Sequence, residues 1–179
     1  MSVELSAADP CVRIRIENTG SIAERTAIRA VNEAAFGGAY EADLVDQLRG
    51  SDYALISLVA ELESRIVGHI MFSRMWIKTS SGLLSAVALA PVAVLPGHQR
   101  KGIGSLLVQR GLELSRGRDE EIVIVVGHPD YYPRFGFSSA KAKSLESPFP
   151  REAFMALELR LGVLDGIEGL VVYPSAFGI

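Results

Sequence analysis

The most informative stretch of the chain is Gln99-Arg-Lys-Gly-Ile-Gly104. It follows a long apolar run, Leu83–Leu95, and precedes a segment with leucines at helical spacing, so it predicts a turn between a strand and a helix N-terminus. Such a terminus leaves backbone N–H groups unpaired and carries partial positive charge. Two glycines let a ligand approach the backbone closely, and Arg100 and Lys101 add cationic side chains. Together these features favour a loop that binds a pyrophosphate.

Two other glycine-rich phosphate motifs fail on spacing. A mononucleotide P-loop needs a Lys and a Ser or Thr directly after its last glycine, but Gly104 is followed by Ser105 and Leu106. A dinucleotide fingerprint needs a third glycine three residues after Gly104, where Leu107 stands. A turn and helix cap without any ligand is the remaining alternative for the loop taken alone.

The flanking sequence interleaves strand and helix patterns. Alternating or β-branched runs predict strands over 12–16, 55–60, 66–72, 83–95 and 122–126, and shorter ones over 138–145, 153–161 and 169–173. Helical patterns follow the capping box Ser21–Glu24, include Leu44 to Leu48 with a stop at Gly50, and run from Ile103 to Gly117. Pro91 cannot donate to a ladder, so a bulge or a splayed edge is expected there. The class is mixed α/β or α+β, with one parallel crossover unit around the loop.

Length and composition indicate one globular domain over residues 1–179, since 49% of the residues are apolar and 22% are charged. The net charge of −3 argues against nucleic acid as a partner. The single cysteine, Cys11, allows no intramolecular disulfide and no cysteine-rich zinc site, so no metal is expected. The N-terminus carries no secretory pattern, and no apolar run is long enough for a membrane helix. We therefore expect a cytoplasmic protein without a membrane partner.

A second motif lies beyond the strand at 122–126. Tyr132-Pro-Arg-Phe-Gly-Phe137 places a tyrosine five residues before the phenylalanine of a Gly-Phe pair. This motif and the loop after the strand Val92–Val94 together resemble the GNAT superfamily of N-acetyltransferases. The wider run His128–Phe137, with Gly68–Ser73 and Ala90–Val94, is similar to the YhbS-like subgroup of that superfamily. The resemblance extends from about Val12 to Tyr173.

The resemblance implies a central, mostly antiparallel sheet flanked by helices, with one parallel pair of strands that splay apart. It also implies acetyl-CoA as cosubstrate. The backbone of Val92, Ala93 and Val94 would hold the pantetheine arm and the thioester carbonyl. The pyrophosphate would bind the N–H groups of the loop residues Arg100, Lys101, Gly102, Ile103, Gly104 and Ser105. Gln99 stands where the family has Gln or Arg.

The implied reaction is direct attack of a primary amine on the acetyl thioester. The amine must first lose a proton, and a backbone N–H on the splayed strand, such as that of Val94, could stabilise the oxyanion. Tyr132 would donate a proton to the leaving thiolate, because a phenol is still protonated at neutral pH. Without the family resemblance, Tyr132 reads as an aromatic residue packed against Phe135 and Phe137.

Several residues near the motifs keep open roles. Tyr131 could replace Tyr132 or line the acceptor pocket, His128 is a candidate proton acceptor, and Glu41 is a candidate base or amine anchor. His69 reads as a hydrogen-bonded core histidine and His98 as part of the loop. The acceptor, a small-molecule or peptide amine, is not specified, and the composition is compatible with a homodimer. A non-catalytic acyl-CoA sensor and a structural domain without cofactor are the alternative functions.

Overall fold

The computed structural model describes residues 11–179. Its strands and helices follow the chain in an α+β order. The strands are β1 (Arg13–Ile16), β2 (Ala54–Leu62), β3 (Arg65–Thr79), β4 (Gly82–Val94), β5 (Ile122–Val126), β6 (Leu145–Glu146), β7 (Phe154–Glu158) and β8 (Gly169–Val172). The α-helices are α1 (Ile22–Phe36), α2 (Tyr40–Gly50) and α3 (Ile103–Gly117), and the short 3₁₀ helices are η1 (Pro96–His98), η2 (Tyr132–Phe135) and η3 (Ser175–Phe177). The expectation about an N-terminal signal falls largely on residues 1–10, outside the described residues.

All eight strands form one open sheet with the order β1-β2-β3-β4-β5-β7, and β8 pairs with the outer half of β3. The sheet is mostly antiparallel, and β4 and β5 are parallel, as the resemblance implied. A second, two-residue parallel pair joins β6 to β8. The mixed class with a mostly antiparallel sheet is therefore confirmed.

The parallel pair splays apart after only two paired positions. Val87 pairs with Val123 and Ala88 with Ile124. Beyond these positions β4 continues to Val94 and β5 to Val126, but the two strands no longer pair with each other. On its other side, β4 carries one extra residue between the Phe72–Leu89 and Ile70–Val92 pairs of the β3 ladder. This bulge includes Pro91, where one was expected. The ends of β4 and β5 therefore enclose an opening in the sheet.

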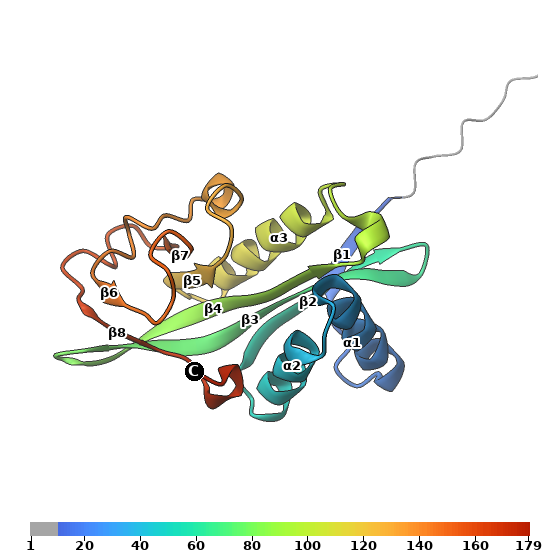
Figure 1. The fold of residues 1–179 in the computed structure, drawn as a ribbon, viewed down its shortest axis with the longest axis horizontal. Coiled ribbons are helices and arrows are strands. Elements are labelled where there is room, and N and C mark those ends of the chain that lie inside the picture. Colours follow the sequence, from blue (N-terminus) through green and yellow to red (C-terminus); the bar gives the residue numbers. More distant parts are fainter. Residues whose placement is uncertain (1–10) are drawn as a thin grey trace, which may run out of the picture.

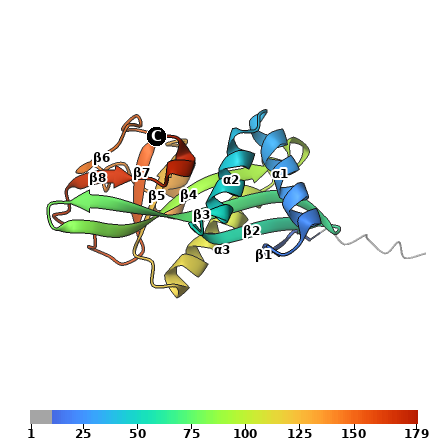
Figure 2. The same cartoon turned by 90° about the horizontal axis from the view of Figure 1, so that it is seen from below.

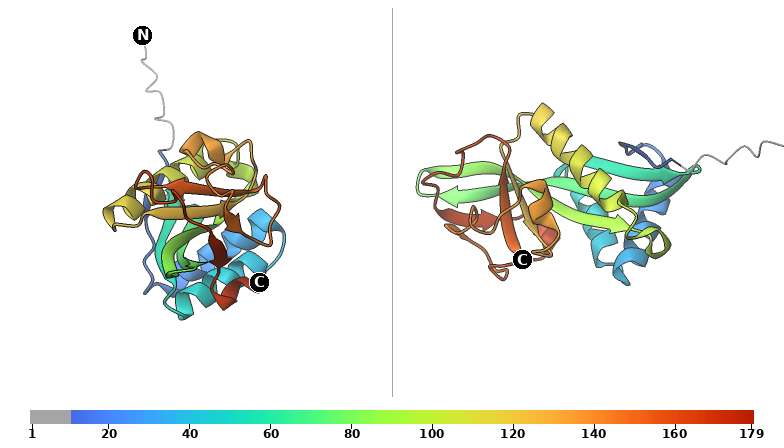
Figure 3. Two further views of the ribbon diagram at one scale, coloured as in Figure 1. Left: turned by 90° about the vertical axis from the view of Figure 1, so that its left-hand side faces the viewer. Right: turned by 90° about the horizontal axis from the view of Figure 1, so that it is seen from above.

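Helices cover both faces of the sheet (Figures 1 and 2). α1 and α2 pack on one face over a core that includes Ile28, Leu48 and Met71. α3 crosses the opposite face, over a core that includes Phe72 and Leu107, as the right-hand view of Figure 3 shows. The side chains of β3 alternate between these two cores, as a strand covered on both sides requires. The splayed strands are therefore held from both faces.

The capping box at the start of α1 forms only in part. Ser21 Oγ accepts a hydrogen bond from the N–H of Glu24, as predicted. The Glu24 carboxylate, however, accepts from the N–H of Asn18 and pairs with Arg15 instead of returning to Ser21. The ion pair with Arg15 lowers the pKa of Glu24. Glu24 thus ties α1 to β1.

Two strand predictions were wrong in extent. Residues 138–145 form turns, with one isolated bridge between Ser138 and Ala156 and the short β6 at their end. β3 is about twice as long as predicted and reaches Thr79, because its outer half pairs with both β4 and β8. Polar residues such as Arg74 and Lys78 interrupt the apolar pattern there, and β8, one of the two partner strands, lies far along the chain.

Candidate active site

The loop between β4 and α3 presents a run of free backbone donors. Gly102 caps α3 in the left-handed conformation with φ 83°, and no side chain caps the helix. Within residues 11–179, the N–H groups of Arg100 through Ser105 donate no hydrogen bond, and the first helical bond runs from Leu106 to Gly102. Free N–H groups at a helix start attract an anion. The loop therefore has the unpaired donors that a phosphate-like group would need.

A cavity of about 640 Å³, here called the loop cavity, lies against these donors. Eight of the ten residues predicted for the cofactor line it: Val92, Val94, Gln99, Arg100, Gly102, Ile103, Gly104 and Ser105. Lys101 and Ala93 do not. The ammonium group of Lys101 instead donates to the carbonyl of Gly97, 3.1 Å away.

The register of β4 explains why Ala93 differs from its neighbours. Leu95 donates its N–H to the carbonyl of Val67 on β3. Because bonding alternates along an antiparallel ladder, Ala93 also bonds to β3, opposite His69, while the N–H and C=O groups of Val92 and Val94 point to the other edge. That edge borders the opening toward β5. The amide of Gln99 donates to the Val94 carbonyl at 3.0 Å and fixes the loop there.

Two adjacent tyrosines at the start of η2 turn to different places. The hydroxyl of Tyr131 lies 3.3 Å from Ser105 Oγ in the first turn of α3, and its ring stacks under the Arg134 guanidinium at 4.6 Å. Tyr132 instead packs edge-on against Phe137, with ring centroids 5.8 Å apart. Tyr131 therefore belongs to the loop cavity alone.

The side chain of Tyr132 is mostly buried but its hydroxyl is free. Burial raises the pKa of Tyr132 to about 12, since the phenolate would lose its hydration, and the nearby Tyr131 acts in the same direction. Within residues 11–179 the hydroxyl has no hydrogen-bond partner, and its oxygen atom is not completely buried. The group can therefore donate a proton or a hydrogen bond to a ligand.

A second cavity of about 480 Å³, here called the aromatic cavity, lies on the other side of the splayed strands. Six aromatic residues line it: Phe36, Tyr40, Tyr132, Phe149, Tyr173 and Phe177. Three residues, Val92, His128 and Tyr132, line both this cavity and the loop cavity. Two ligands, one in each cavity, would therefore meet beside Tyr132.

Comparisons with known proteins bear on this arrangement. The model of the acetyltransferase (GNAT) family matches residues 25–137. The chain belongs to this family. An uncharacterized N-acetyltransferase of Escherichia coli K12, YjhQ, is 40% identical over 126 residues, which cover 69% of this chain and 70% of YjhQ. The prediction of an acyltransferase is thereby confirmed.

Two solved structures of GNAT proteins have the same fold. The E. coli protein YhbS in complex with CoA superposes with a TM-score of 0.86, 28% identity and coverage of 97% of this chain and 96% of YhbS. A GNAT acetyltransferase of Brucella melitensis in complex with acetyl-CoA gives a TM-score of 0.77 and 32% identity, with coverage of 94% and 99%. The predicted GNAT architecture is therefore confirmed.

Other candidates from the sequence occupy different parts of this GNAT domain. His128 is exposed at the boundary of the two cavities, Glu41 lines the aromatic cavity and His98 lines the loop cavity. Cys11 is exposed near β1 and lines neither. Apart from Tyr132, the aromatic residues of the second cavity were missed, because they come from α1, α2, the loop before β7 and the C-terminus, and no local pattern joins them.

His69 is a core histidine, as expected. Its Nε2 lies 2.9 Å from Ser57 Oγ, and its Nδ1 accepts from the amide of Asn32 at 3.2 Å. Burial lowers the pKa of His69 to about 3, and the nearby Arg49 acts in the same direction. The ring is therefore neutral, with its proton on Nε2, which donates to Ser57 Oγ. The hydroxyl of Ser57 in turn donates to the carboxylate of Glu17.

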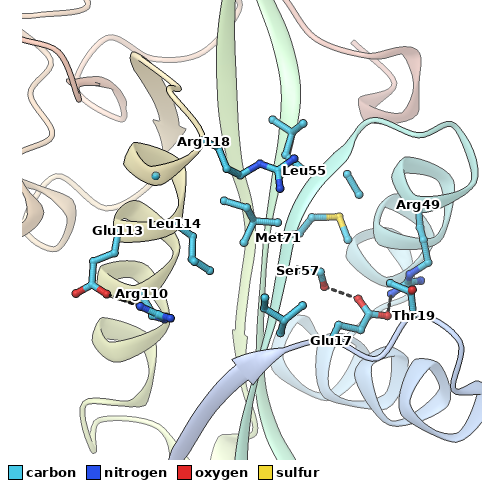
Figure 4. Close-up of a pocket in the computed structure, with 14 residues that line it drawn as sticks. Glu17, Thr19, Arg49, Leu55, Ser57, Met71, Arg110, Glu113, Leu114 and Arg118 are labelled. Atoms are coloured by element: carbon cyan, nitrogen blue, oxygen red, sulfur yellow. Dashed lines mark hydrogen bonds and ion pairs between the residues drawn. The ribbon is translucent and has the colours of Figure 1, made fainter.

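A third cavity of about 360 Å³ lies between α3 and the end of β1 (Figure 4). Figure 4 shows Arg110 and Glu113 of α3 on one side and the Glu17–Arg49 pair on the other. The Glu17 side chain is fully buried and lies 2.7 Å from Arg49. None of the residues predicted for the site lines this cavity.

In the part of the chain that the structure describes, no helix has both the length and the apolar character needed to span a bilayer. The same residues contain no group of three His, Cys, Asp or Glu side chains placed to hold a metal ion.

Proposed function

We propose that this GNAT protein transfers the acetyl group of acetyl-CoA to a primary amine by direct attack, with Tyr132 as general acid. The observation that carries the proposal is the position of Tyr132, whose free hydroxyl belongs to a side chain that lines both cavities. The loop cavity has the donors for a pyrophosphate, and the aromatic cavity has room for an acceptor. The acetyl group and the amine would meet where the cavities join.

The chain offers a fitting group for each part of acetyl-CoA. The six free N–H groups of Arg100 through Ser105 would bind the pyrophosphate. The free edge of β4 at Val92 and Val94 would hydrogen-bond the amides of the pantetheine arm, since those backbone groups are not used by β3. Gln99 would position the loop through its bond to the Val94 carbonyl. Ala93 would contribute through the β3 ladder alone.

In the proposed reaction, the amine nitrogen forms a bond to the acetyl carbon, and the bond from that carbon to sulfur breaks. The N–H of Val94 would stabilise the oxyanion, because it points to the free edge of β4. Tyr132 would give its proton to the thiolate and recover one from water. The burial that raises the pKa of Tyr132 also disfavours a thiolate beside it, which keeps that transfer feasible. His128 is exposed at the junction and could pass the amine's proton to solvent.

The alternative is a sensor that binds acyl-CoA on the same fold without turnover. Both functions require CoA binding, so the first measurement is thermal unfolding with acetyl-CoA, CoA, ATP and NAD. Ligand at about 100 times its dissociation constant adds roughly 2.7 kcal/mol, which raises the midpoint on the order of 5–10 °C. We expect a rise with the two CoA species only. No rise with either would remove the basis of both functions.

Turnover separates the enzyme from the sensor. With an amine that is acetylated, Tyr132→Phe should lower kcat by about 100-fold, the usual size of a general-acid contribution. Tyr131→Phe is the matched control, because its hydroxyl contacts the α3 terminus: kcat should hold while the KM for acetyl-CoA rises a few-fold. Equal kcat in wild type and Tyr132→Phe would contradict the role of Tyr132, and binding without turnover of any amine would favour the sensor.

A further inference from the structure

The aromatic cavity has an unusual lining for a site that receives an amine. Its walls are mostly apolar and aromatic, and among residues 11–179 the only acidic side chain that lines it is that of Glu41 at the start of α2. A volume of about 480 Å³ lies within the range of small-molecule sites, roughly 300–1,000 Å³. Size and lining thus suit one small organic molecule with a single cationic group.

Glu41 differs from the other acidic residues of its helix. Asp43 binds Arg29 at 2.7 Å, and Asp46 binds both Arg29 and Arg49 at 2.8–2.9 Å on the outer face. Glu41 is half-buried at the cavity and makes no hydrogen bond or ion pair within residues 11–179. A partly desolvated carboxylate without a partner attracts a cation. The cavity therefore offers a counter-charge for one ammonium group.

The aromatic wall is held in place before any ligand arrives. The ring of Tyr173 packs against Phe149 with centroids 5.9 Å apart and against Phe177 at 4.9 Å. The hydroxyl of Tyr40 donates to the carbonyl of Phe177 at 2.7 Å and fastens the C-terminus to α2. Figures 1 and 2 both show η3 beside α2. Aromatic faces bind apolar groups and also attract cations.

We propose that the acceptor is a primary monoamine on an apolar or aromatic body, of the arylalkylamine type, with Glu41 as the anchor of its ammonium group. This inference rests on the acetyl transfer proposed above. A polyamine or an aminoglycoside would bring further positive charges into a cavity where the described part of the chain places no second carboxylate side chain, and those charges would lose hydration without compensation. A small polar amine would leave the aromatic wall unused.

The test compares four amines at saturating acetyl-CoA by release of free thiol: 2-phenylethylamine, ethanolamine, spermidine and kanamycin. We expect kcat/KM for 2-phenylethylamine to exceed each of the others by at least about tenfold. A preference for spermidine or kanamycin, or equal rates with ethanolamine, would overturn the acceptor class and leave acetyl transfer intact. No turnover of any amine, or no stabilisation by acetyl-CoA, would overturn the proposed function as well.

A binding measurement avoids turnover altogether. Titration calorimetry of 2-phenylethylamine into protein saturated with CoA, which cannot transfer an acetyl group, reports acceptor binding alone. Saturable binding that ethanolamine and spermidine do not reproduce supports the monoamine class. Tighter binding of spermidine than of 2-phenylethylamine contradicts the monoamine class, even if no amine is turned over in the enzyme assay.

Two variants locate the site. Glu41→Gln should raise the KM for 2-phenylethylamine by about tenfold with little change in kcat. Asp43→Asn on the same helix is the control, because Asp43 pairs with Arg29 outside the cavity, and its KM should stay at the wild-type value. Phe36→Ala removes an aromatic face that is 46% exposed and should raise the same KM while the midpoint of unfolding holds. An unchanged KM in Glu41→Gln would overturn the role of Glu41.

Discussion

The ring of Tyr132 packs so closely on Gly127 that a Cβ built at Gly127 would lie 2.2 Å from the ring atom Cε2. The backbone of Gly127 is not in the left-handed region, so an alanine would be allowed there by conformation alone. Glycine is needed at this position for the space it leaves. Gly127 directly follows β5, so it seats Tyr132 at the junction of the two cavities.

Gly127→Ala should therefore displace the Tyr132 ring. We expect a loss of about 10- to 100-fold in kcat, since a shift on the order of 1 Å in a reacting group has this effect. The affinity for acetyl-CoA should change little, because the loop is untouched. Gly50→Ala at the end of α2 is the control, with no atom within 4 Å of the new methyl group. Wild-type kcat in Gly127→Ala would contradict the placement of Tyr132.

The pH dependence of kcat follows from the raised pKa of Tyr132. A general acid works while it is protonated, so activity that depends on it is lost only as the pH rises through the folded-state value of about 12. We therefore expect no descending limb from Tyr132 between about pH 8 and 10. Initial rates at saturating substrates over this range check the prediction. A descending limb near pH 9 that Tyr132→Phe abolishes would show that the phenol ionises far more easily.

Close packing of α3 on the sheet also depends on one glycine. A Cβ on Gly111 would lie 2.1 Å from Cε2 of Phe72, which is completely buried. Gly111→Ala should destabilise the fold by about 1–3 kcal/mol, as overpacking of a core does. Gly117→Ala, at the end of the same helix in open space, should be neutral or slightly stabilising. Urea unfolding of both variants measures the difference, and equal stabilities would mean that Phe72 can move aside.

Acid stability should depend on His69. The folded-state pKa of about 3 lies below the ordinary value of 6.5. Between pH 3 and 6.5, His69 is therefore protonated in the unfolded chain and neutral in the folded chain. Stability must then fall as the pH drops below 6.5, by about 1.4 kcal/mol per pH unit from this one group.

Urea unfolding at several pH values between about 4 and 6 tests this linkage. In His69→Gln, the free energy of unfolding should fall less steeply with decreasing pH, by about 1.4 kcal/mol per pH unit. The variant loses hydrogen bonds to Ser57 and Asn32, so it should also be less stable at neutral pH. If His69→Gln keeps the wild-type slope, the buried ring is not the source of the acid sensitivity.

The glycine-rich loop and the membership of the GNAT family could both be predicted from local sequence. The pattern from Gln99 to Gly104 and the spacing from Tyr132 to Phe137 each involve residues that are close together in the sequence. Such patterns can be recognised without knowing any contact between distant segments. Left-handed backbone at Gly102 and a helix start at Ile103 follow from the same few residues. Pro91 likewise marked the bulge beside the splayed strands, because a residue without an N–H cannot continue a ladder.

The different surroundings of neighbouring residues depend on the tertiary structure. Tyr131 and Tyr132 are adjacent in sequence, yet one contacts Ser105 and the other lines both cavities. The free edge of Val92 and Val94 follows from the register with β3, which the sequence of β4 does not contain. The aromatic cavity joins Tyr40 to Phe177, which are 137 positions apart. Such contacts depend on how the helices and the C-terminus pack on the sheet, and side-chain packing between distant segments leaves no periodic trace in the chain.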